Sequence, residues 1–222
     1  MNGRPGDAAA LVAVVGGDGA GKSTLTGLLH RRLTAAGTPA RRVDRWDVLA
    51  TADYPTAACL RPDERQARSC AARMSTGPRL LFLLWASALA LTDRAGGMPG
   101  EVVLLDGYWM KHAAAEIAYG ADPAWVEAVA AGLPPVDLVV HLRLEPELTW
   151  ARKDGRPLPF ECGMDLSCSR SSFLAHQGAL LTVLDRWAER HGWLVLDATA
   201  PTPVLADRVA AALADRRATM EA

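Results

Sequence analysis

A stretch of nine residues near the start of the chain indicates phosphate-binding chemistry; residues 16–24 read Gly-Gly-Asp-Gly-Ala-Gly-Lys-Ser-Thr. The spacing fits the P-loop pattern of glycine, any four residues, glycine, lysine, and serine or threonine. A phosphate chain needs several inward-pointing backbone N–H groups, which a tight glycine-rich turn leading into a helix can supply. The pattern therefore predicts a nucleotide site formed by Gly16, Gly19, Ala20, Gly21, Lys22, Ser23 and Thr24.

Two side chains of this stretch have separate chemical roles. Lys22 would place positive charge on the β- and γ-phosphates, and the Ser23 hydroxyl is a hard oxygen ligand suited to Mg²⁺. Asp106, which ends an apolar run over residues 101–105, would hold the same ion through water. The alternative for Asp106 is a helix cap or a turn carboxylate. We therefore expect ATP and Mg²⁺ as cofactors.

Strands and helices alternate along the chain in a way that would position these residues. Apolar runs predict strands at residues 11–15, 101–105, 136–144 and 193–196, and a short strand is expected at residues 40–43, after Gly37 and Pro39 end the preceding helix. Helical spacing separates them, notably over residues 25–33, 63–74, 79–94 and 202–217. The pattern predicts an α/β fold with a doubly wound, parallel, five-stranded sheet and helices on both faces. Ligands bind such sheets at the carboxyl ends of the strands.

Length and composition suit one soluble domain. The chain has 222 residues and a formal net charge of -1, which argues against broad binding to nucleic acid or to an anionic membrane. Its apolar runs at residues 8–15 and 80–91 are too short to span a membrane. Cys59, Cys70, Cys162 and Cys168 form no Cys-x-x-Cys pair, so we expect reduced thiols in a cytoplasmic protein and no zinc site.

These features together resemble the thymidylate kinases, within the P-loop nucleoside and nucleotide kinases. The P-loop carries that family's extra acidic residue, Asp18, and residues 80–94, 103–109 and 135–150 are similar to its apolar helix, its strand ending in Asp-Arg-Tyr and its strand leading into the lid. The resemblance covers nearly the whole chain. It implies a single kinase domain over residues 1–222 that transfers the γ-phosphoryl group of ATP to a nucleoside monophosphate. Dimers are usual in the family, which leaves a homodimer open.

The resemblance also implies a mobile lid, here at about residues 152–168. In the family the lid supplies arginine to the transferring phosphoryl group, and this P-loop has Gly19 where an arginine could stand. Arg152 and Arg156, with Lys153, are the candidates, because a guanidinium fork matches the charge that develops on the phosphoryl oxygens. Asp18 would face the acceptor. The alternative for the basic side chains is a solvated loop.

The chain departs from the family at two anion-binding positions. Gly107 stands where the family has the arginine that binds the acceptor's phosphate, and Ala86-Ser87 stand where it has Asp-Arg. Either other cations bind that phosphate, with Arg45, Arg79 and Lys111 as candidates, or the acceptor is not a nucleotide.

A second acceptor class is indicated by residues 44–47, which read Asp-Arg-Trp-Asp after the second predicted strand. In the related deoxynucleoside kinases, a carboxylate at this place, followed by a tryptophan, takes the proton from an acceptor hydroxyl. Asp47 or Asp44 would do the same for a nucleoside or another small metabolite; alternatively, both are turn aspartates. Trp46 and Tyr108 would stack on a base or sugar, or form the wall of the pocket. A third hypothesis is a nucleotide-binding switch without turnover.

Overall fold

A computed structural model describes residues 10–47, 64–92, 100–154 and 156–221. Within them, five parallel strands form one sheet in the order β2-β3-β1-β4-β5. The strands in that order are Ala40–Val43, Val102–Asp106, Ala10–Val15, Leu138–Arg143 and Leu194–Asp197. This arrangement confirms the predicted doubly wound α/β fold.

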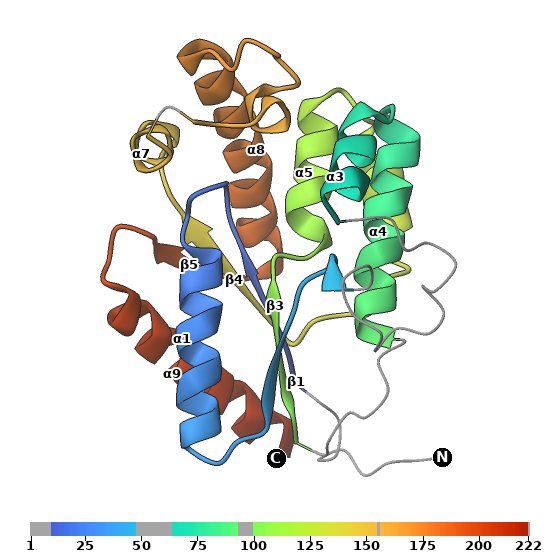
Figure 1. Ribbon diagram of the computed structural model, residues 1–222. Helices are drawn as coiled ribbons and strands as arrows, with labels where there is room; N and C mark the ends of the chain where they lie inside the picture. Colours follow the sequence, from blue (N-terminus) through green and yellow to red (C-terminus); the bar gives the residue numbers. More distant parts are fainter. Residues whose placement is uncertain (1–9, 48–63, 93–99, 155, 222) are drawn as a thin grey trace.

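Helices cover both faces of the sheet (Figure 1). One face packs against α1 (Lys22–Ala35) and α9 (Thr202–Glu221), and the apolar cluster between them includes Val12 and Val14 of β1. Ala13 and Val15 belong to the other apolar cluster. Its helices are α3 (Glu64–Arg73), α4 (Thr76–Thr92), α5 (Trp109–Ala118), α6 (Pro123–Ala130) and α8 (Arg170–His191). Burial on both sides explains why the central strands β3, β1 and β4 read as mainly apolar runs.

The boundaries differ from the sequence predictions in places. Helix α4 begins at Thr76 and not at residue 79, because Pro78 lies in its first turn, where a missing N–H breaks no helical bond. Between β4 and α8, the segment expected to be a lid follows α7 (Pro146–Arg152) and contains a short 3₁₀ helix, η2 (Pro159–Cys162). The loop expected at residues 50–62, Cys59 and Asp63 lie outside the described residues. Among the described cysteines, Cys70, Cys162 and Cys168 are free thiols.

The carboxyl ends of the strands bring the candidate residues to one edge. The P-loop follows Val15 of β1, and Asp106 pairs in register with Val14. The turn at residues 44–47 follows β2, which neighbours β3 in the sheet. The structure thus places the predicted phosphate site and the predicted acceptor residues at the same end of the sheet. No helix in the described ranges is both long and apolar enough to cross a bilayer.

Candidate active site

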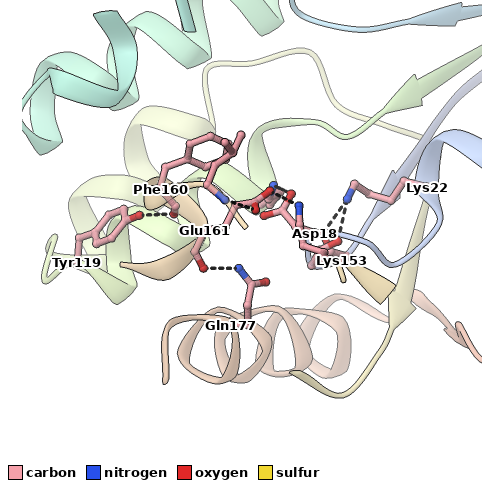
Figure 2. Close-up of polar contacts among 11 residues, drawn as sticks. Asp18, Lys22, Tyr119, Lys153, Phe160, Glu161 and Gln177 are labelled. Carbon is pink, nitrogen blue, oxygen red and sulfur yellow. Dashed lines mark hydrogen bonds and ion pairs between the residues drawn. The ribbon is translucent and has the colours of Figure 1, made fainter. Parts of the chain in front are cut away.

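The P-loop joins β1 to α1 through a backbone that requires glycine. Gly16 has a φ of +150°, and a Cβ there would lie 2.5 Å from the Leu142 carbonyl oxygen of β4. Gly21 caps α1 in the left-handed region, with a φ of +95°. The Nζ atom of Lys22 donates to the carbonyl oxygens of Gly16, at 3.3 Å, and Gly17, at 2.9 Å (Figure 2). The loop therefore has the tight turn and the helix start that the sequence predicts.

The close approach of the loop to β4 is testable by adding one methyl group. We expect Gly16→Ala to lower the free energy of unfolding by ~2 kcal/mol or more, because the new Cβ overlaps a backbone oxygen that cannot rotate away. Gly178→Ala in α8 is the matched control; its Cβ meets nothing within 4 Å, and alanine favours helix by ~0.5–1 kcal/mol. Urea denaturation measures both. Wild-type stability in Gly16→Ala would contradict this packing.

Three lysines surround the loop and set its electrostatics. Asp18 forms an ion pair with Lys111 of α5. Burial alone would raise the pKa of Asp18, but the charges of Lys111, Lys22 and Lys153 outweigh it and hold that pKa well below its usual range. Burial, followed by the charge of Lys111, lowers the pKa of Lys22 to about 8. Near pH 7, Asp18 is thus a carboxylate and Lys22 is predominantly an ammonium ion.

Ser23 and Asp106 are the residues predicted to bind Mg²⁺, and both lie near Lys22. Ser23 is exposed in the first turn of α1, and the pKa of Lys22 responds to the charge of Asp106, so that carboxylate lies near the P-loop. A hydroxyl and a carboxylate are the oxygen ligands that Mg²⁺ prefers. Asp106 also accepts a hydrogen bond from Arg42 of β2 at 3.1 Å. Sequence reasoning missed Arg42, because its partner depends on the pairing of β2 with β3.

A cavity of about 270 Å³ borders the P-loop at Asp18. Of the residues expected to bind the acceptor, Asp18, Arg45, Trp46 and Arg79 line it. Lys111, named as an alternative anion ligand, lines it as well. Sequence reasoning missed most other residues of the wall, among them the polar residues Arg68, His112 and Glu116. A helical spacing of apolar residues reveals which side chains face the core, but α3 and α5 present these polar side chains to a space formed only by tertiary packing.

Among the described residues, each carboxylate that lines the cavity has a cationic partner. Asp18 pairs with Lys111, as above. Glu116, which is 2% exposed, accepts from Nε of Arg79 and from its Nη2, the latter at 2.8 Å. Glu161 lies 2.7 Å from the Nζ atom of Lys153. The negative charge of the wall is therefore already neutralised by cations.

Arg45 differs from these cations because, within the part of the chain that the structure describes, no ion pair joins its side chain to a carboxylate. Its Nε atom is buried and has no hydrogen-bond partner. It lies 5.2 Å from the centre of the Trp46 ring, and the Arg68 guanidinium lies 4.7 Å from the same centre. Burial, opposed by Asp44 and reinforced by Arg68, lowers the pKa of Arg45. Arg45 and Arg68 thus place two positive charges in the wall of the cavity, which favours an anion there.

Asp44 and Asp47 form the turn that presents Arg45 and Trp46. The Asp44 carboxylate accepts from the Trp46 backbone N–H at 2.8 Å, and the Asp47 carboxylate accepts from that of Asp44 at 3.0 Å. Neither lines the cavity. Tyr108 does not line it either: it is 3% exposed in the core, and its hydroxyl donates to the Pro134 carbonyl oxygen at 3.0 Å. The geometry gives these three residues structural contacts, and their predicted roles toward substrate stay predictions.

The lid candidates lie at different distances from the loop. Arg152 donates to the carbonyl oxygens of Gly19, at 3.3 Å, and Ala198, at 2.8 Å, so it is beside the P-loop. Arg156 pairs with Asp154 at 2.9 Å, and its side chain is 83% exposed. The structure therefore brings Arg152 to the site, whereas Arg156 points to solvent.

Glu161 anchors the segment after α7 to the rest of the site, as Figure 2 shows. Its carboxylate accepts from the backbone N–H of Leu158 at 2.8 Å as well as from Lys153. Gln177 of α8 donates to the Glu161 carbonyl oxygen at 3.0 Å, and the hydroxyl of Tyr119, the residue after α5, donates to the Phe160 carbonyl oxygen at 2.8 Å. Phe160 and Glu161 line the cavity, so these bonds hold part of its wall in place.

A parallel sheet of order 2-3-1-4-5 with a P-loop after its central strand defines the fold of P-loop nucleotide kinases. Over 149 residues, the chain is 30% identical to a protein of Aeropyrum pernix named "Putative thymidylate kinase"; the match covers 66% of this chain and 67% of that protein. No family model matches the chain. On the strength of that relative, the chain belongs to the thymidylate kinase-like family.

Proposed function

We propose that this protein is a Mg²⁺-dependent kinase that transfers the γ-phosphoryl group of ATP to a nucleoside monophosphate. The observation that carries the proposal is Arg45, whose buried Nε atom has no hydrogen-bond partner and whose side chain lines a cavity that borders the P-loop. The name of the Aeropyrum pernix relative, "Putative thymidylate kinase", supports the same reaction class.

The charges of the cavity favour a phosphate over a neutral hydroxyl as the acceptor group. A hydroxyl acceptor benefits from a carboxylate that takes its proton, yet the carboxylates of the described wall are held by cations, and the pKa of Asp18 is well below its usual range. A monophosphate is already anionic and needs positive charge instead. Arg45 and Arg68 would supply it, replacing the family arginine that is Gly107 here.

The P-loop side of the site would bind ATP and stabilise the transferring group. Backbone N–H groups of the loop and the ammonium group of Lys22 would hold the β- and γ-phosphates. Ser23 and Asp106 would hold Mg²⁺, which supplies neutralising charge on the phosphates when bound. Arg152 and Lys153 are close enough to act with little movement, whereas Arg156 would need residues 152–168 to close as a lid. An acceptor oxygen then attacks the γ-phosphorus as ADP leaves.

Asp47→Asn tests the competing hydroxyl-acceptor reaction. We expect kcat/KM to change by less than ~3-fold, because an anionic acceptor needs no base and asparagine can still accept from the Asp44 N–H. Steady-state kinetics at saturating ATP measure this, with Asp44→Asn as the companion variant. A loss of ~10²-fold or more, with the fold intact by circular dichroism, would instead identify Asp47 as a general base.

A phosphotransfer screen tests the proposed function directly. The purified protein is incubated with ATP and Mg²⁺ and, in separate reactions, with nucleoside monophosphates including thymidylate, with nucleosides, and with sugars, and the products are identified by mass spectrometry. We expect a nucleoside diphosphate. A product formed only from an uncharged acceptor would overturn the monophosphate proposal. ATP hydrolysis without transfer to any acceptor would favour the switch hypothesis.

A further inference from the structure

His112 is an unused polar group in the wall of the acceptor cavity. It lies in the first turn of α5, directly after Lys111, and it lines the cavity together with Asp18 and Arg45. Its imidazole makes no hydrogen bond with any group in the described part of the chain. The residue is partly exposed, and the cavity that it lines is the space from which a ligand could reach its ring.

The charges that face His112 come from several elements. Lys111 of α5, Arg45 after β2, Lys22 of α1 and Arg68 of α3 all disfavour its protonation; together with burial, which is the largest cause, they hold the pKa of His112 well below its usual value. Other ionisable groups of the wall are Asp18, Arg79, Glu116, Glu161 and His176. Without a ligand, His112 is therefore a neutral imidazole among cations.

Binding of a dianion in this cavity would favour the protonated form of His112. The dianion would neutralise the cations that repel an imidazolium and would accept a hydrogen bond from the ring. We propose that His112 is an anion-binding residue of the acceptor site, which hydrogen-bonds the acceptor's phosphate and gains one proton as that phosphate binds. The proton comes from solvent to a ring nitrogen and returns to solvent when the ligand leaves. The identity of the anion as a phosphate rests on the proposed function; the site itself does not.

Inorganic sulfate is a suitable probe because it is a dianion that does not titrate near neutral pH. The protein is first saturated with ADP and Mg²⁺ to occupy the P-loop, and sulfate binding is then measured by calorimetry in two buffers of different ionisation enthalpy. We expect uptake of about half a proton or more per sulfate at pH 6.5, where ordinary histidine is half protonated, and almost none at pH 8.5. Absence of sulfate binding, or binding without proton uptake, would overturn the proposal.

His112→Gln should bind sulfate about 10-fold more weakly and take up no proton, because glutamine donates a hydrogen bond but does not titrate. His191→Gln, at an exposed histidine at the end of α8, is the matched control and should behave as wild type. Uptake that persists in His112→Gln would mean that another group, such as His176, gains the proton. Should that variant fail to fold, the ¹⁵N signals of the wild-type His112 ring report the same proton: they should change from neutral to imidazolium with sulfate, and no change would overturn the proposal.

The sulfate experiment and the phosphotransfer screen can fail independently. Proton uptake at His112 in a protein that phosphorylates no monophosphate would establish the anion site and refute the proposed acceptor. Monophosphate kinase activity without proton uptake would leave the function intact and remove His112 from the anion site.

Discussion

Replacing Lys22 with alanine is expected to lower kcat/KM for ATP by ~10²-fold or more, because the ammonium group meets charge that grows on the phosphates during transfer. In the structure this group lies against the carbonyl oxygens of Gly16 and Gly17 and is held by the loop that would bind those phosphates. The measurement is ADP production under steady state with the acceptor found in the screen. Arg208→Ala, which removes an exposed cation from α9, is the control and should retain wild-type rates.

The loss in Lys22→Ala should not come from unfolding. Because folding lowers the pKa of Lys22 to about 8, the charged form is less favourable in the folded protein than in the unfolded chain. The charge therefore opposes folding below pH 8, and this penalty disappears as the pH rises towards the unfolded pKa. We expect the variant to unfold at the wild-type temperature or slightly above. Near-normal turnover in a folded Lys22→Ala protein would contradict a catalytic P-loop.

The sheet and the P-loop were predictable because their signals are local in sequence. The buried apolar runs at β1, β3 and β4 become the three central strands, since a strand buried on both faces leaves few polar positions in its pattern. Gly16 and Gly21 are required by backbone geometry that involves a few neighbouring residues. Local chemistry of this kind can be inferred without knowing which strands become neighbours.

The acceptor site was only partly predictable because its pairs join distant segments. Arg79 was predicted to bind an anion of the substrate, but its guanidinium donates instead to the carboxylate of Glu116, which lies 37 residues later in the chain. Asp106 was predicted only as a metal ligand, but its carboxylate also accepts a hydrogen bond from Arg42 of the neighbouring strand β2. Trp46 was recognised, whereas Arg68, which lies over the same ring, comes from a helix whose packing the sequence does not specify. A cation's role depends on whether the fold gives it an anion, which sequence alone does not show.

Arg45→Met is expected to weaken binding of the acceptor without lowering the free energy of unfolding. This combination would distinguish a cation that binds substrate from one that stabilises the fold. Hydrogen bonds to a charged group contribute ~1.5–3 kcal/mol, so KM for the acceptor should rise ~10–100-fold, with KM for ATP within ~2-fold of wild type. The free protein should be at least as stable as wild type, because the substitution replaces a buried Nε atom that has no hydrogen-bond partner with an apolar side chain of similar length.

Arg79→Met gives the opposite result and serves as the matched comparison. It leaves Glu116, 2% exposed, without its cation, so the free energy of unfolding should fall by ~3–5 kcal/mol. Urea denaturation of both variants, with acceptor KM for each one that folds, completes the comparison. If Arg45→Met lost stability as Arg79→Met does, or kept a wild-type acceptor KM, the Arg45 guanidinium would belong to the framework of the fold and the acceptor's anion would have to bind elsewhere. If the two effects separate as expected, the missing family arginine at Gly107 is replaced by a cation from the turn after β2.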